Sequence, residues 1–271
     1  MSTTIGWHAF RNTGLTSIII PNSITTIGKW AFFDCNRLTS VKIGNGVKTI
    51  DGSAFNSCRS LKEFIVEIDN TAFASNDGVL FNKDFSMLIA YPNGKSPVYT
   101  IPNSVTKIGD SAFGDCQGLT SIVIPNGVNM IGDYAFQGCS NITKANSINP
   151  IAPQVTGSGT NFFDDNVFAE ATLNVPIGAS ASYRSADGWK NFVNIKEVDF
   201  SGVESVNNDN VKVVTNGNVI MVSGIDENML IEVYNLNGQL TYSGTDKTIT
   251  VQTSGFYIVK IAGKTYKVAV K

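Results

Sequence analysis

The chain has 271 residues with a net charge of −2 at pH 7, and only 15% of its residues are charged. A chain of this length predicts two domains, each long enough to bury a core of its own. The charge balance leaves no basic face for nucleic acid, and no apolar run approaches the roughly 20 residues of a membrane-spanning helix. We therefore expect a two-domain protein with no nucleic-acid partner and no membrane span.

A repeated pattern, I-G-x-x-A-F-x-x-C-x-x-L-T-S-I-x-I-P-N-x-V, runs along the first half of the chain. Its copies begin at Ile5, Ile27, Ile50, Ile108 and Ile131. A fixed period in the low twenties is typical of a solenoid, in which each coil buries its apolar face against its neighbours. The sequence therefore predicts a mostly β fold, built as a solenoid with short helical turns.

Each coil carries an extended stretch such as Leu119-Thr-Ser-Ile-Val-Ile124. Side chains alternate along such a stretch, so Ile122 and Ile124 should face the core. Ser121 and Val123 should then face outward. The A-F-x-x-C segment is expected to form a short helical turn that brings the chain back for the next strand.

The four cysteines occupy one position of the repeat, three residues after the Phe of A-F: Cys35, Cys58, Cys116 and Cys139. Equivalent positions of stacked coils line up, so we expect a buried column of thiols that pack as small apolar groups. Disulfides are the alternative, because adjacent coils are close enough for bridging. Zinc is disfavoured, since C-x-x-C pairs are absent and His8 is the single histidine.

The repeat is interrupted between about residues 67 and 107. There, Gly78–Phe81 and Met87–Tyr91 flank the turn sequence Asn82-Lys-Asp84, which predicts a β-hairpin insertion. One interpretation is a protrusion that shapes a binding surface. The other is a coil that has gained a purely structural excursion. The regular pattern is expected to return at Tyr99.

From about residue 146 to residue 198 the pattern decays, which predicts a C-terminal cap. Ala171–Pro176 is expected to be the last strand, and Gly178–Ala186 a helix over the open end of the stack. Trp189 should close the core as a lid. Terminal coils of a solenoid must differ from the others to end the stack, so this segment needs no functional explanation.

After a predicted linker at residues 199–202, the rhythm changes to short alternating stretches between Val211 and Val270. Seven such stretches separated by turn signals predict a small antiparallel β-sandwich over residues 203–271.

The stretch from Ala112-Phe113 to Pro125, and a variant from Ala31-Phe32 to Ile43-Gly44, resembles the BspA-like leucine-rich repeats of cell-surface proteins best known from Bacteroidetes. The resemblance covers residues 5 to about 198. It implies that residues 1–198 form a leucine-rich-repeat solenoid used for adhesion or ligand binding.

A second resemblance lies in the C-terminal domain. Ile231–Gly238, together with Ser254–Lys260 and Lys264–Lys271, resembles the sorting domain of the Por (type IX) secretion pathway. This resemblance implies export across the outer membrane and attachment at its surface.

The first copy of the repeat begins almost at Met1, with no signal peptide before it. We expect a leader and some N-terminal repeats to have been removed, and the protein to lie outside the cell or on the outer-membrane surface. An uncovered first coil should also give some weak self-association.

The outward strand positions are the candidate partner-binding face: Ile19, Lys42, Glu63, Ile65 and Val123. Five or six strands at about 4.8 Å would give a sheet roughly 25 Å wide, enough to contact a protein or glycan of a host or neighbouring cell. The apolar members would stand out on a face of Ser and Thr, although β-branched residues also simply suit strands. We expect non-catalytic binding or adhesion without a cofactor. The alternative is a structural spacer that displays parts of a larger surface protein.

A hydrolase or a calcium-binding protein is the remaining interpretation. It would depend on Asp164-Asp165 with Glu170, or on Asp226-Glu227. Both groups fall in polar, loop-like stretches, where solvated surface is the ordinary explanation. His8 lies in the first repeat, which leaves no histidine to act as a general base elsewhere. We therefore expect no catalytic residue and no metal site.

Overall fold

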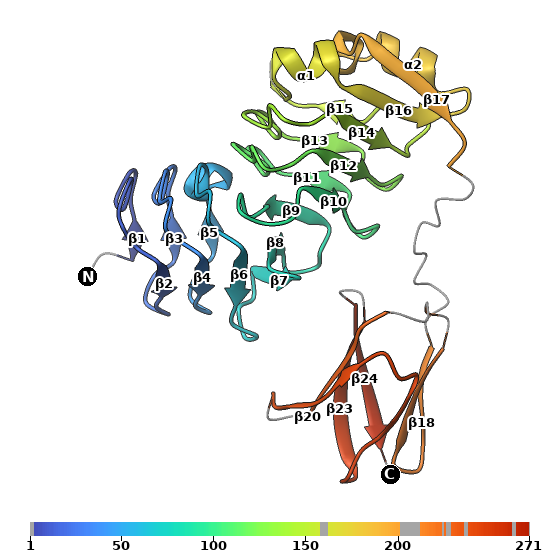
Figure 1. Cartoon of the computed structure of the whole chain (residues 1–271). Coiled ribbons are helices and arrows are strands. Elements are labelled where there is room, and N and C mark those ends of the chain that lie inside the picture. The colour runs from blue at the N-terminus through green and yellow to red at the C-terminus, as the bar shows by residue number, and fades with distance from the viewer. Residues whose placement is uncertain are drawn as a thin grey trace. The chain divides into compact units, whose positions relative to one another are not determined.

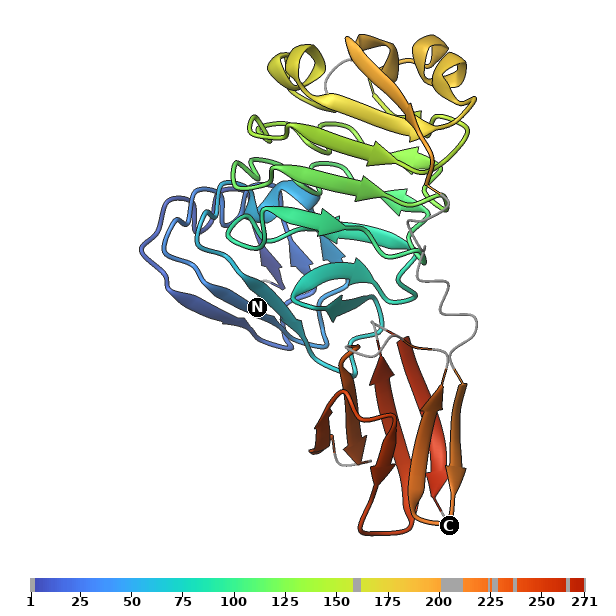
Figure 2. The ribbon, with the colours of Figure 1, turned by 45° about the vertical axis from the view of Figure 1, so that its right-hand side comes forward.

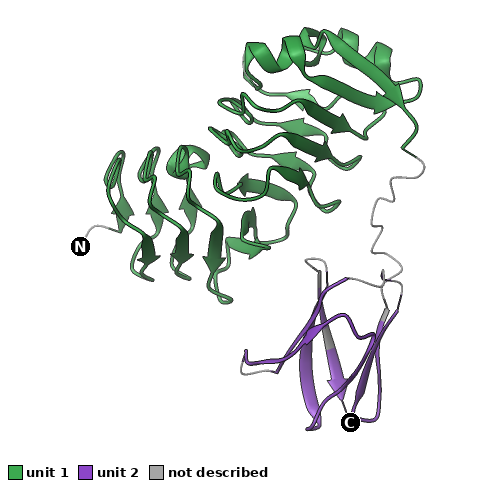
Figure 3. Cartoon of the chain, viewed as in Figure 1, with its two compact units in different colours: residues 1–205 green, residues 206–271 purple. Residues whose placement is uncertain are grey.

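The computed structural model describes residues 3–157, 162–200, 212–223, 225, 229–235, 238–261 and 264–270. The chain forms two compact units, residues 1–205 and 206–271 (Figure 3). The carboxylates Asp226 and Glu227 lie outside the described residues.

The first three coils build two parallel ladders (Figure 1). The short strands pair in the order β1 (Thr4–Ile5), β3 (Thr26–Ile27) and β5 (Thr49–Ile50). The longer strands pair in the order β2 (Ser17–Ile20), β4 (Ser40–Ile43) and β6 (Glu63–Val66). Equivalent repeat positions are partners, as in Ile18 with Val41 and Val41 with Phe64, because each coil repeats the one before it.

The later coils form a second pair of sheets, which Figure 2 shows as stacked rungs beneath the cap. One sheet runs β10 (Val98–Thr100), β12 (Ser121–Ile124), β14 (Lys144–Ser147), β16 (Thr172–Pro176) and β17 (Asn194–Val198). The other includes β11 (Lys107–Ile108), β13 (Met130–Ile131) and β15 (Gln154–Val155). The cap adds α1 (Asp165–Glu170), α2 (Ser180–Ser185) and the 3₁₀ turn η2 (Trp189–Asn191).

The interruption of the repeat is a three-stranded antiparallel meander rather than a hairpin alone. Its strands are β7 (Phe73–Asn76), β8 (Val79–Asn82) and β9 (Met87–Ala90). β9 also pairs in parallel with β11, and the ring of Tyr91 stacks on that of Phe113 at 5.1 Å between centroids. The regular coils therefore resume at Met87, earlier than the expected return at Tyr99, with Tyr91 in the place of the usual Phe.

The meander lies between two hydrophobic cores and contributes side chains to both. Leu80 and Ile89 pack into the core of the first three coils. Val79, Phe81 and Leu88 pack into the core of the later coils. Val79–Phe81 of β8 and Met87–Ala90 of β9 are continuous apolar runs, as expected of strands that have both faces buried. The interpretation of this segment as a protrusion is therefore wrong, and its role in the fold is structural.

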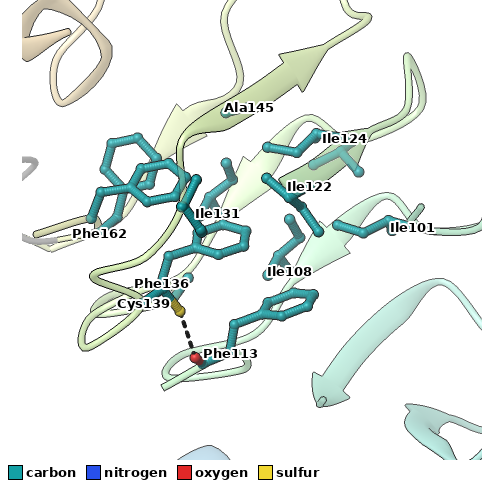
Figure 4. Close-up of a cluster of buried hydrophobic side chains, with 14 of the residues drawn as sticks. Ile101, Ile108, Phe113, Ile122, Ile124, Ile131, Phe136, Cys139, Ala145 and Phe162 are labelled. Carbon is teal, nitrogen blue, oxygen red and sulfur yellow. Dashed lines mark hydrogen bonds between the residues drawn. The ribbon is translucent and has the colours of Figure 1, made fainter. Parts of the chain in front are cut away.

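Columns of aromatic rings and thiols fill the coils. Phe113 stacks on Phe136 at 4.8 Å and Phe136 on Phe163 at 4.6 Å, with the aliphatic strand residues packed beside them (Figure 4). All four cysteines are buried free thiols, as predicted, but the meander divides the expected column into two pairs, Cys35 with Cys58 and Cys116 with Cys139. The Cys139 thiol donates a hydrogen bond to the Phe113 carbonyl at 3.0 Å. Burial raises the pKa of Cys139, so the sulfur keeps its proton.

The A-F-x-x-C segments are mostly tight turns and not the helical turns that the pattern predicts. Only Gly52–Phe55, here η1, is a 3₁₀ helix among the described copies. In the Ile108 copy, Ser111 and Asp115 have positive φ angles of 53° and 60°. Left-handed residues at these two points interrupt helical hydrogen bonding, so the segment forms turns and not a helix.

The second unit contains two antiparallel sheets around one core (Figure 1). One sheet pairs β18 (Lys212–Asn216), β19 (Val219–Ser223) and β22 (Thr248–Thr250). The other pairs β21 (Leu240–Gly244), β20 (Ile231–Asn235), β23 (Gly255–Ile261) and β24 (Lys264–Val270). The predicted fold class, a mostly β solenoid followed by a small antiparallel β unit, is confirmed.

Candidate binding face

The outward side of the β2–β4–β6 sheet carries a row of one cation between two apolar residues. Ile19 is the partner of Lys42, and Lys42 is the partner of Ile65. Ile19 is 71% exposed and Ile65 is 43% exposed. Large aliphatic side chains cost free energy when they stay exposed to water. Here two of them are exposed, one on each of the strands that flank the strand of Lys42.

A second row on the same face is polar. Ser17 pairs with Ser40, and Ser40 pairs with Glu63, which is exposed. The Lys42 ammonium lies 2.7 Å from the Glu67 carboxylate, and both side chains are about two-fifths exposed. This ion pair contributes little to stability at such exposure, but it fixes the lysine beside the apolar row.

Val123 lies in a different sheet from the other four candidate residues. Its strand β12 pairs with β10 and β14, where Thr100 and Asn146 are the partners of Val123. The meander between β6 and β10 divides the expected face in two, so no single sheet of five or six strands carries all five residues. The structure brings Ile19, Lys42, Glu63 and Ile65 together and leaves Val123 apart.

The face around Val123 is polar. Across the strands, Asn146 pairs with Asn174. The side-chain amide of Asn174 donates a hydrogen bond to the side-chain oxygen Oδ1 of Asn146 at 2.8 Å. Lys196 continues the row on β17. The exposed aliphatic pair of the first sheet has no counterpart in this row, so the two sheets present different chemistry to a partner.

An aromatic cluster on the turns of the first two coils was not predicted as a site. It comprises Trp7, His8, Trp30 and Phe33, with Arg11 and Lys29 beside the rings. The signal was present in the sequence, because the two variable positions before A-F read Trp-His in the first copy and Lys-Trp in the second. These positions differ from copy to copy, so the shared pattern of the repeat does not mark them.

Of the carboxylates considered for catalysis or calcium, Asp164 has a structural contact and Asp165 and Glu170 lie exposed. Asp164 precedes α1, and its carboxylate accepts a hydrogen bond from the Gly138 amide at 2.9 Å. Asp165 and Glu170 begin and end α1, so the expected loop is a helix and the two residues are exposed. Among the described residues, no group of three or more potential ligands is placed to hold a metal ion.

The repeated pairs of strands and the ring at the turn of each coil define a solenoid of the leucine-rich-repeat class. Residues 2–81 and 90–210 match the BspA type leucine rich repeat region in six copies, and the chain belongs to this family. Proteins of this type are typically found at the cell surface. In the part of the chain that the structure describes, no helix is long and apolar enough to cross a membrane.

Several solved structures are similar to this chain. A leucine-rich repeat protein from Eubacterium ventriosum is 22% identical over 63% of this chain and 56% of that chain, with a TM-score of 0.48. The pneumococcal vaccine antigen PcpA is 18% identical over 72% of this chain and 71% of that chain, with a TM-score of 0.43. A leucine-rich repeat protein from Bacteroides ovatus is 24% identical over 72% of this chain and 45% of that chain, also with a TM-score of 0.43. The chain thus spans less than two thirds of the first of these proteins. No curated protein matches it.

Proposed function

We propose that this protein is a non-catalytic binding module of the cell surface, and that the outward face of β2–β4–β6 contacts a protein or glycan partner. The proposal rests on one observation. Ile19 and Ile65 expose apolar side chains on either side of Lys42, which a strand of the fold does not require outside its core.

The spacing of the strands supports a macromolecular partner. Three strands at about 4.8 Å separation place the two isoleucines roughly 10 Å apart, which matches neighbouring side chains of a protein or adjacent sugars of a glycan. The surrounding Ser17, Ser40 and Glu63 supply a polar rim that can exchange hydrogen bonds with the partner.

We also propose that residues 206–271 act as a Por-type sorting domain. The support is the resemblance of Ile231–Gly238 and Ser254–Lys260 to such domains, together with the family's usual place at the cell surface. Export would then attach the solenoid to the outer-membrane surface, facing host or neighbouring cells.

The test is binding of the whole chain to a panel of extracellular-matrix proteins and to a glycan array. The double variant Ile19→Asp/Ile65→Asp should weaken the strongest interaction at least about tenfold, because buried charge at the centre of an interface is costly. Val123→Asp, on the other sheet, is the matched control and should bind as the parent does. Thermal melts of all variants verify that the fold is kept.

Two results would contradict the proposal. Binding by the double variant at parental strength would show that this face is not used. A chain that binds nothing in either panel would favour the alternative, a structural spacer that displays other parts of a surface protein.

A further inference from the structure

The stacked rings on the turns of the first two coils form a second surface, separate from the strand face. The Trp7 and His8 rings stack at 4.4 Å between centroids, and His8 and Trp30 stack at 5.4 Å. Phe33 meets Trp30 edge-on at 6.2 Å. Trp7 is 67% exposed.

The fold does not require these rings. None of the four belongs to a described core cluster or packs against one. His8 and Trp30 occupy a left-handed turn position, with φ of 58° and 54°, that Ser111 occupies in a later coil at 53°. A tryptophan costs about 1–2 kcal/mol in this region, where asparagine, aspartate and histidine are better tolerated. Trp30 therefore stands at a backbone cost that packing into the core does not explain.

Two cations accompany the rings. Lys29 Nζ lies 4.4 Å from the Trp30 ring centroid, and Arg11 Cζ lies 5.2 Å from that of Phe33. Neither is among the described ion pairs. Asp34 is the carboxylate next to Phe33, and it accepts a hydrogen bond from the Asn36 side chain. Partial desolvation and the nearby Arg11 lower the pKa of His8, so its ring is neutral at pH 7.

We propose that this cluster is a carbohydrate-binding platform selective for acidic sugars. The C–H face of a pyranose ring packs on the exposed face of Trp7, as apolar groups pack on aromatic rings. A uronic-acid or sialic-acid carboxylate then pairs with the Arg11 guanidinium or the Lys29 ammonium. The same two cations repel choline-like or other cationic ligands, which would otherwise suit an aromatic surface.

Tryptophan fluorescence of the whole chain provides the readout. The chain has three tryptophans, and the third, Trp189, is fully buried, so a ligand-dependent change should report on Trp7 and Trp30. The probes are tetragalacturonate and its uncharged counterpart, a galactose tetramer. The acidic probe should bind with a dissociation constant below about 1 mM, and the neutral probe at least about tenfold more weakly.

Three variants test the residues. Trp7→Ala and Trp30→Asn should each weaken tetragalacturonate binding at least about tenfold, and asparagine suits the left-handed backbone at position 30. Arg11→Gln/Lys29→Gln should bring the affinity for the acidic probe down to that for the neutral one. Tyr134→Asn is the matched control, because Tyr134 is exposed at the same turn position of a later coil with φ of 55°. It should leave binding unchanged. Calorimetry replaces fluorescence for the tryptophan variants.

Several outcomes would overturn the proposal. These are no response to tetragalacturonate at 10 mM (about tenfold above the expected limit), equal binding of both probes, or an equal loss in Tyr134→Asn. A dimer that Trp7→Ala converts to a monomer would instead assign the rings to self-association. The Ile19→Asp/Ile65→Asp variant should keep sugar binding, so failure here is distinguishable from failure of the strand-face proposal.

Discussion

The phenylalanine and cysteine that repeat from coil to coil link neighbouring coils through two kinds of contact. A phenylalanine stacks on the ring of the next coil, and its carbonyl accepts a hydrogen bond from a cysteine of that coil. Cys58 donates to Phe32 at 3.1 Å, and Cys139 donates to Phe113 at 3.0 Å. A buried thiol here thus fills space and also satisfies a buried backbone carbonyl.

Replacing one ring of the column should be strongly destabilising. Phe113 is fully buried and stacks on both Tyr91 and Phe136. Phe113→Ala should lower the free energy of unfolding by about 3–5 kcal/mol, because it removes apolar contact and leaves a cavity. Phe10→Ala is the control, since Phe10 is only partly buried in the first coil. Equal losses in urea melts of the two variants would contradict this account.

Which residues face the core was predictable from the sequence, because the inward positions carry the same residue types in each copy. The burial of Leu119, Ile122 and Ile124 follows this rule. The aromatic platform was not predictable in the same way. Trp7 and Trp30 stand at variable positions, and only the stacking of adjacent coils brings them together.

Among the elements, the meander depends on one buried side chain at its start. Asn70 is fully buried, and its amide nitrogen donates to the carbonyls of Gly44 and Val47. Its carbonyl oxygen accepts from the amides of Ala72 and Phe73. One side chain therefore ties the entry of β7 to the coil before it.

Asn70→Ala should lower the free energy of unfolding by about 2–4 kcal/mol, because the buried Val47 carbonyl and Phe73 amide would lose this hydrogen-bond partner. Asn149 offers a matched control. It bonds the carbonyls of Asn126 and Val128 in the same manner but is partly exposed, so water can replace it. Asn149→Ala should cost clearly less in thermal or urea melts. A larger loss for Asn149→Ala than for Asn70→Ala would refute the argument.

The sequence indicated the strands β8 and β9 but not the third strand β7 or the division of the sheet. Continuous apolar runs such as Val79–Phe81 fit a strand buried on both faces, yet the run itself does not say which two cores it separates. Tyr91 does not match the repeat pattern, because its coil has Ala-Tyr instead of Ala-Phe. This coil is also two residues shorter between Leu88 and Ala90 than the next one is between Ile108 and Ala112.

At the scale of the whole molecule, the cores of the two units share no residue. The solenoid cores include only residues up to Phe192 among their buried members, and the second core begins at Ile220. Each unit therefore has the burial it needs to fold by itself.

A chain shortened to residues 1–200 tests both this independence and the proposed sorting role. It should unfold within about 2 °C of the main transition of the full chain, since its cores are complete. When produced in a bacterium that has the Por (type IX) secretion pathway, it should fail to reach the cell surface, as detected by protease accessibility on intact cells. A shortened protein that still reaches the surface would contradict the sorting role, and a marked drop in its melting temperature would contradict independent folding.

The way in which coils hold one another also has a mechanical consequence. Under tension, coils should peel from an end one at a time, because each is held only by its neighbours. A coil of 23 residues, the spacing between Cys35 and Cys58, would release about 80 Å of slack chain. The meander, anchored in two cores at once, would resist longest. A tether built in this way should lengthen in small steps under force, one coil at a time, before it unfolds completely.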